Sequence, residues 1–174
     1  MLPEGKPAFE WVNGRALQKV SPKRWHSLAQ TRFAAALLSW ACARGAGMVG
    51  TEWRFRVMPK GEERRPLVPD VAFLSYERMP YEEQERTDEP GIAPDVVVEV
   101  RSPGDLQADI DEKIRVYLKA GTAVVFLVEP KKKSVTVHDR DGKRLLGLED
   151  TITHAALPGF ALDVRELFTL PRPK

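Results

Sequence analysis

Apolar positions along this chain recur at helical spacing in two segments. Between Ser21, a suitable helix cap, and Gly45, a suitable helix end, they come every three or four residues and predict one long helix that packs on a sheet. A second stripe over residues 105–120 predicts a crossover helix that Gly121 ends. The apolar positions of the first helix are Trp25, Leu28, Ala29, Phe33, Ala36, Leu37 and Trp40, and those of the second are Leu106, Ile110, Ile114, Tyr117 and Leu118.

Short runs rich in β-branched and aromatic residues predict strands between and after these helices. We expect them at residues 48–58, 67–74, 95–100 and 123–128, and the last run is apolar throughout, as in a strand buried on both faces. Hairpins are expected over residues 10–20, turning at Asn13-Gly14, and over residues 134–148, turning at Asp141-Gly142. The acidic segment 75–93 is expected to be a solvated loop without a catalytic role.

These elements predict an α/β fold, in which a mixed sheet is flanked by helices and carries additional hairpins. The strand–helix–strand order over residues 95–128 favours a parallel pair of strands. We see no linker, repeat or low-complexity segment, and therefore expect residues 1–174 to form a single domain.

Composition narrows the class of protein only slightly. The chain has 174 residues, of which 43% are hydrophobic and 30% charged, so disorder and a fibrous architecture are not favoured. Its net charge of +2 neither indicates nor excludes a nucleic-acid partner. Cys42 is the only cysteine, which rules out an intrachain disulfide and a four-cysteine zinc site. With no apolar run long enough to span a bilayer, a cytoplasmic protein is expected.

An acid interrupts the most apolar of the shorter strands, Val96-Val97-Val98-Glu99-Val100. Strand alternation places Glu99 on the same face as Asp95 and Arg101. Burying an unpaired carboxylate costs several kcal/mol, so Glu99 requires a cation, a set of hydrogen-bond donors or a metal ion. A purely structural Arg–Glu pair is the alternative.

A second acid, Asp70, follows Pro69 at the start of another apolar strand. Two carboxylates on adjacent strands can hold a hard cation such as Mg²⁺, which lowers the pKa of bound water and stabilises developing charge. Such a centre also needs a positive group near a scissile phosphate. Lys113 borders the apolar stripe of the second helix and is the candidate; an exposed helix pair with Asp109 is the alternative.

The order of two acid-bearing strands and a crossover helix resembles the PD-(D/E)XK restriction-endonuclease-like superfamily, and most of the chain resembles its Uma-two family of endonucleases. The resemblance is carried by Pro69-Asp70-Val71-Ala72-Phe73, Pro94-Asp95-Val96-Val97-Val98-Glu99-Val100, Ser102-Pro103, Lys113 with Tyr117, Ala120-Gly121, Val125-Phe126-Leu127-Val128-Glu129-Pro130 and the segment from Leu157 to Phe168. It implies a restriction-endonuclease-like fold and metal-dependent hydrolysis of DNA phosphodiester bonds. Asp70 and Glu99 would bind Mg²⁺ or Mn²⁺, and Lys113 would be the catalytic lysine.

The chain departs from the superfamily motif at Arg101, two residues after Glu99, where the motif has lysine. Arginine contacts phosphate but stays protonated, so Lys113 takes the lysine's place only if the helix brings it near. Two further residues are auxiliary candidates. Asp95 is either a third acid or a turn cap, and His26 either assists the site or packs beside the first helix.

Several basic residues are candidates for phosphate contacts, although most surface charges have no such role. They are Lys23, Arg24, Arg54, Arg56, Arg64, Arg65 and Lys131-Lys132-Lys133. Two alternatives to a nuclease remain open: a catalytically inactive nucleic-acid-binding or protein-interaction module, motivated by Arg101, and a hydrolase of small phosphate esters. Exposed strand edges also suggest a homodimer.

Overall fold

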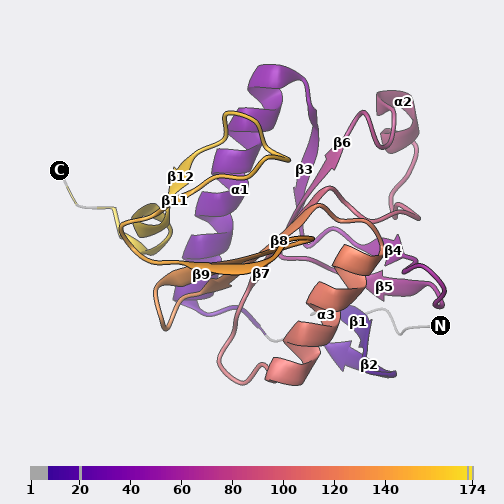
Figure 1. The fold of residues 1–174 in the computed structure, drawn as a ribbon, viewed down its shortest axis with the longest axis horizontal. Coiled ribbons are helices and arrows are strands. Elements are labelled where there is room, and N and C mark those ends of the chain that lie inside the picture. Colours follow the sequence, from indigo (N-terminus) through magenta and orange to yellow (C-terminus); the bar gives the residue numbers. More distant parts are fainter. Residues whose placement is uncertain (1–7, 20, 172, 174) are drawn as a thin grey trace.

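A six-stranded sheet forms the centre of the computed structural model, which describes residues 8–19, 21–171 and 173. The strands lie in the order β10-β9-β8-β7-β6-β3 (Figure 1). Only β7 and β8 are parallel, so the sheet is mixed, as predicted. The strands are β3 (Gly47–Thr51), β6 (Val71–Ser75), β7 (Val96–Val100), β8 (Val124–Glu129), β9 (Ser134–Asp139) and β10 (Gly142–Leu146).

Helices cover the two faces of this sheet. On one face α1 (Arg24–Arg44) buries Phe33 and Leu37 in a core that also contains Val98 of β7. On the other face α3 (Gln107–Lys119) buries Tyr117 in a second core with Val97. Successive residues of β7 thus enter different cores, and any polar side chain on this strand is held between packed layers.

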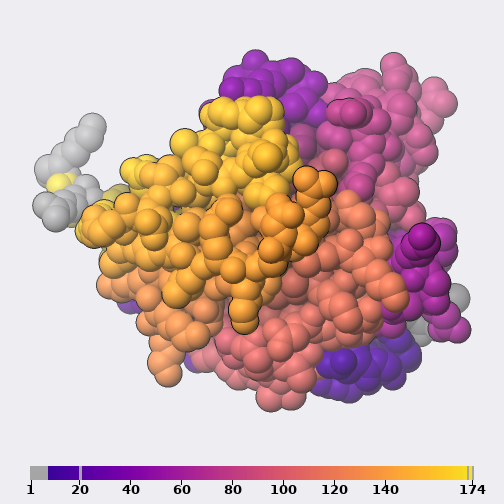
Figure 2. Space-filling model, viewed as in Figure 1, coloured from indigo at the N-terminus to yellow at the C-terminus, as the bar shows by residue number. Residues whose placement is uncertain are grey.

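Small sheets and short helices surround the central layer. The hairpin of β1 (Phe9–Val12) and β2 (Arg15–Gln18) turns at Asn13-Gly14, both with positive φ, as predicted. It lies beside α3, where indigo and salmon surfaces meet in Figure 2. The remaining elements are β4 (Phe55–Val57), β5 (Arg65–Leu67), α2 (Tyr81–Gln84), β11 (Thr151–Ile152), β12 (Leu162–Asp163) and the 3₁₀ helix η1 (Val164–Phe168).

Several element boundaries differ from the sequence prediction. The strand expected over residues 48–58 is two strands, β3 and β4, because the chain bends at Glu52, where φ is 52°. The strand expected over 67–74 is also divided: β5 ends at Leu67 and β6 begins after Pro69, which has no N–H for a ladder. These breaks move β4 and β5 out of the central sheet into a separate pair.

The helix limits shift as well. The first helix has Lys23 rather than Ser21 as its N-cap, whereas Gly45 ends it in the left-handed conformation as expected. In the second helix Leu106 is an exposed N-cap outside the buried stripe, and Ala120 precedes Gly121 as the C-cap. None of the helices in the described ranges combines the length and apolar character needed to cross a bilayer.

Candidate functional site

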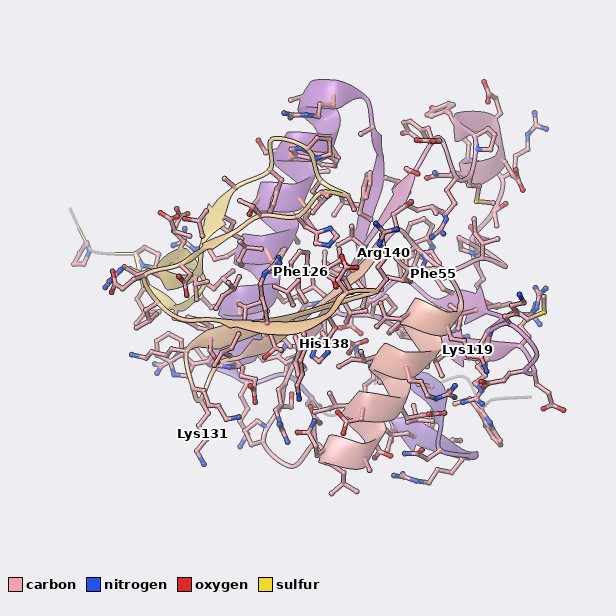
Figure 3. The ribbon with its side chains drawn as sticks, in the orientation of Figure 1. Phe55, Lys119, Phe126, Lys131, His138 and Arg140 are labelled. Carbon is pink, nitrogen blue, oxygen red and sulfur yellow. The ribbon has the colours of Figure 1, made fainter. Side chains whose placement is uncertain are left out.

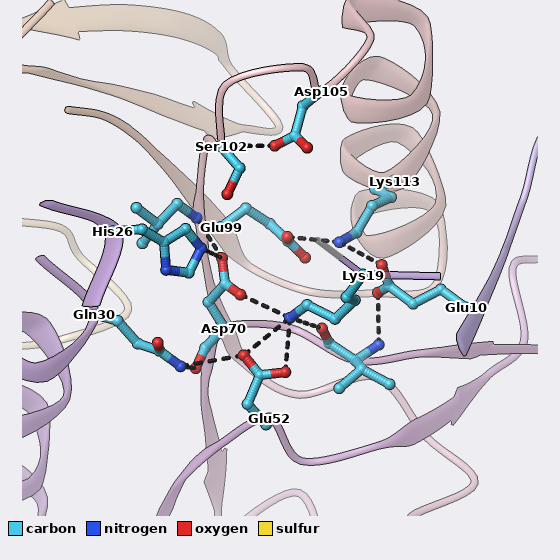
Figure 4. Close-up of polar contacts among 12 residues, drawn as sticks. Glu10, Lys19, His26, Gln30, Glu52, Asp70, Glu99, Ser102, Asp105 and Lys113 are labelled. Carbon is cyan, nitrogen blue, oxygen red and sulfur yellow. Dashed lines mark hydrogen bonds and ion pairs between the residues drawn. The ribbon is translucent and has the colours of Figure 1, made fainter. Parts of the chain in front are cut away.

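A pocket of about 350 Å³ lies where the β1–β2 hairpin, the start of α1, the end of β7 and α3 meet. Asp70, Glu99 and Lys113 all line it (Figure 4). The antiparallel register pairs Val71 with Val98, which sets Asp70 and Glu99 side by side. The structure therefore brings together all three residues singled out as the main site.

Asp70 is 2% exposed, and both of its carboxylate oxygens accept hydrogen bonds. Oδ1 lies 2.7 Å from Lys19 Nζ, and Oδ2 lies 2.6 Å from the Val100 N–H and 3.3 Å from His26 Nε2. Burial opposes the charge, but Lys19 and His26 outweigh it and hold the pKa of Asp70 below its ordinary value. Asp70 is thus an ionised, fixed carboxylate.

Glu99 lies buried on the face of β7 that α3 covers, and it has two hydrogen-bond partners on that helix. Its Oε2 lies 2.6 Å from Lys113 Nζ, and its Oε1 accepts a hydrogen bond of 3.2 Å from the Tyr117 hydroxyl. Burial raises the pKa of Glu99 to about 8, since the nearby negative charges add to desolvation and Lys113 compensates only part of it. Its structural partner is a lysine, not the arginine of the alternative interpretation.

Lys113 points from α3 into the cluster and is 8% exposed. Its Nζ lies 2.6 Å from Glu99 Oε2 and 3.0 Å from Glu10 Oε2. Burial alone would lower its pKa, but Glu10 and Glu99 raise it above the ordinary value, so Lys113 remains an ammonium. The alternative interpretation, an exposed helix pair of Lys113 with Asp109, is wrong, because Lys113 is buried and Asp109 binds Arg15 instead, at 2.7 Å.

Two residues of the cluster, Glu10 and Lys19, were not predicted from the sequence. Glu10 is 2% exposed and accepts a 2.7 Å hydrogen bond from the Val68 N–H as well as binding Lys113. Lys19 follows the hairpin and binds Asp70, the Val68 carbonyl at 2.9 Å and Glu52 at 2.9 Å. Glu10 lies on the same face of the hairpin as the buried Val12. The alternation of side chains along a strand could therefore have predicted from the sequence that Glu10 is buried.

The three auxiliary candidates lie in different places. His26 lines the pocket beside Asp70. Arg101 lies at the pocket's edge, where its Nη1 contacts Gln107 at 2.8 Å and Glu129 at 3.2 Å. Asp95 lies at the opposite end of β7, about 13 Å along the strand from Glu99, and accepts a 2.7 Å hydrogen bond from the Ser75 N–H. Asp95 therefore bonds to the end of β6 and does not line the pocket.

The donor set of the pocket suits a hard divalent cation. Glu10, Asp70 and Glu99 supply three carboxyl groups against the two ammonium groups of Lys19 and Lys113. Mg²⁺ is commonly held by one or two carboxylates together with water and substrate oxygens. Among the residues with described positions, no group of three or more His, Cys, Asp and Glu side chains could hold a metal ion. The pocket therefore fits a cation that is held by two carboxylates together with water and substrate oxygens, not one that protein side chains alone surround.

Comparison with known proteins agrees with this fold. A crystal structure of a "putative nuclease" of DUF820 from Anabaena variabilis ATCC 29413 superposes with a TM-score of 0.85, at 26% identity, over 96% of this chain and 93% of that chain. No curated protein matches. The predicted restriction-endonuclease-like fold is confirmed. The Uma2 family model, described as "Putative restriction endonuclease", matches residues 1–165, and the chain therefore belongs to the Uma2 family.

Proposed function

We propose that this protein is an endonuclease that hydrolyses DNA phosphodiester bonds with Mg²⁺ or Mn²⁺ bound by Asp70 and Glu99. The observation that carries the proposal is the excess of buried carboxylate at the floor of a pocket, with an ammonium group 2.6 Å from Glu99. The family and the solved neighbour support a nuclease. Three buried acids that share only two ammonium groups favour an additional bound cation.

In this proposal the side chains of the pocket have different roles. A bound divalent cation supplies Lewis acidity and lowers the pKa of its water. Lys113 stays protonated, so it donates hydrogen bonds to the nucleophile or the phosphate rather than removing a proton. Lys19 and His26 keep Asp70 ionised and oriented. We expect Arg101, at the pocket edge, to contact a neighbouring phosphate.

Plasmid nicking tests this assignment. The wild type is expected to nick supercoiled plasmid in Mg²⁺ or Mn²⁺ and to stop in EDTA, while Asp70→Asn, Glu99→Gln and Lys113→Met lose about 100-fold or more in rate. Lys119→Ala, an exposed lysine on the same helix, serves as the matched control and should retain the wild-type rate. Equal rates in all five proteins refute the assignment.

One observation favours a second candidate, a catalytically inactive binding module. All four carboxylate oxygens of Asp70 and Glu99 already have protein donors, so the fold can satisfy these acids without a metal ion. In that case Mn²⁺ fails to bind and DNA is retained without being cut. Metal-dependent nicking that depends on Glu99 eliminates this candidate.

A further inference from the structure

A second hollow, of about 840 Å³, adjoins the candidate active pocket. One of its walls is the start of α1, and the other is the turn between β8 and β9, formed by residues 130–133. The two hollows have five lining residues in common, so they lie side by side. The shared residues are His26, Arg101, Ser102, Gly104 and Asp105. We call the second hollow the basic groove.

The charge of the basic groove is unbalanced toward the positive. Lys132 binds Glu129 at 2.9 Å, but Lys23, Lys131 and Lys133 form no ion pair with any described residue. Lys131 projects outward from the turn after β8 (Figure 3). The first turn of α1 contains no acid and no side-chain cap, which leaves the positive end of the helix dipole uncompensated. A chain of phosphates fits this potential.

An aromatic surface accompanies the charge. Trp25 lines the groove, and the guanidinium of the adjacent Arg24 lies 4.8 Å from its ring centroid. Nucleic-acid bases stack on aromatic rings and arginine planes irrespective of sequence, whereas paired bases are already stacked on their neighbours. A tryptophan beside unpaired lysines therefore suits an unpaired strand.

The burial of the two carboxylates also favours an unpaired strand as the substrate. Asp70 and Glu99 are 2% and 9% exposed at the floor of a pocket of about 350 Å³. Duplex DNA is stiff over about 150 base pairs, so a paired strand does not bend locally into such a pocket. A single strand can bend there and bring one phosphate to Glu99.

We propose that the basic groove binds a single strand of DNA and leads it to the site, so that the enzyme acts on unpaired strands such as flaps, gaps and open arms. The lysines contact the backbone, and Trp25 stacks on a base. This inference rests on the proposed function for its cleavage step. It adds a substrate class and a binding surface that extends beyond the metal-binding residues.

Binding in EDTA tests the groove without any cleavage. Fluorescence anisotropy would compare a fluorescein-labelled single-stranded oligonucleotide with its duplex, over a range of salt concentrations. The wild type is expected to bind the single strand at least about tenfold more tightly. Lys131→Ala/Lys133→Ala should weaken that binding about tenfold and reduce the salt slope by about 1.4, since each single-strand phosphate contact contributes about 0.7. Trp25→Leu should weaken it by a similar factor.

The matched control is Lys60→Ala/Lys143→Ala, which removes two exposed lysines outside the groove and should change affinity less than twofold. Circular dichroism checks that Trp25→Leu folds, and the lysine pair decides the question if it does not. Equal or tighter binding of the duplex, or a groove variant that behaves like the control, overturns the inference.

A cleavage assay separates this inference from the proposed function. In Mg²⁺ the wild type should cut a forked duplex in its unpaired arms and leave intact a blunt linear duplex of the same sequence, which lacks the strand opening that negative supercoiling favours in the plasmid. Cutting of both substrates at equal rates overturns the single-strand inference while upholding a nuclease. Absence of any cutting refutes the proposed function, and the binding results in EDTA then still support or overturn the groove.

Discussion

Helix α3 takes part in two clusters of charged side chains that differ in their exposure to solvent. The outer cluster joins α3 to β5 and the loop before it. The inner cluster, shown in Figure 4, joins the same helix to β7 and the β1–β2 hairpin. The outer cluster consists of Glu62, Arg65, Glu112, Arg115 and Lys119. The inner cluster consists of Glu10, Lys19, Asp70, Glu99 and Lys113.

The same residue types behave in opposite ways in the two clusters. In the outer cluster Arg115 and Lys119 lie 2.6 and 2.7 Å from Glu62 and lower its pKa to about 2. In the inner cluster burial raises the pKa of Glu99 to about 8 despite a lysine at 2.6 Å. Cations outnumber acids outside, and acids outnumber cations inside. An acid that its own fold leaves undercompensated is suited to bind an external cation.

The largest expected effect comes from removing a lysine of each cluster in turn. Lys113→Ala leaves the buried Glu10 and Glu99 without their shared cation and should lower the free energy of unfolding by about 3–5 kcal/mol. Lys119→Ala removes a half-exposed partner of Glu62 and should cost no more than about 0.5 kcal/mol. Urea unfolding of both variants measures the two values. Equal losses would contradict the distinction between the clusters.

An effect of intermediate size is expected from pH in metal-free protein. The pKa of Glu99 rises from 4.5 to about 8 on folding, so the folded state holds its proton more tightly than the unfolded state. This contribution to stability is complete below pH 4.5 and is lost as pH rises to 8. Thermal melts in EDTA should show the decline in the wild type and a flatter profile in Glu99→Gln. A parallel decline in both proteins would assign it to another group.

The smallest effect is expected in the outer cluster, with the opposite sign. Because the pKa of Glu62 falls from 4.5 to about 2 on folding, its contribution is present above pH 4.5 and disappears as pH falls to 2. Glu62→Gln should lower the melting temperature slightly at neutral pH, and the difference should vanish near pH 2. Salt should reduce it too. A difference that grows on acidification would reverse this assignment.

The sequence predicted the parts of the site that lie on regular elements or directly beside them. Glu99 interrupts a valine strand, Asp70 directly precedes an apolar one, and Lys113 borders a helical stripe, so local periodicity was sufficient to find all three. The strand–helix–strand order predicted the parallel pairing of β7 with β8, which the structure confirms. Composition added little, because both charge clusters use common residue types.

The remainder of the site depends on contacts between distant segments. Lys19 binds Asp70, 51 positions away in the sequence, and Glu10 binds Lys113, 103 positions away. No local pattern encodes the docking of the hairpin that brings them there. The breaks at Glu52 and Pro69 were missed for a similar reason, since β4 and β5 pair with each other away from the central sheet. A mostly apolar run of residues does not by itself show where the chain leaves the central sheet.

A titration with Mn²⁺ tests the central claim, that the inner cluster takes up a cation which its own lysines do not replace. Isothermal calorimetry would compare the wild type with Glu99→Gln from the inner cluster and Glu62→Gln from the outer one. We expect the wild type and Glu62→Gln to bind Mn²⁺ with equal affinity and Glu99→Gln to lose that binding. Unchanged binding in Glu99→Gln, or no binding by the wild type, would contradict the claim.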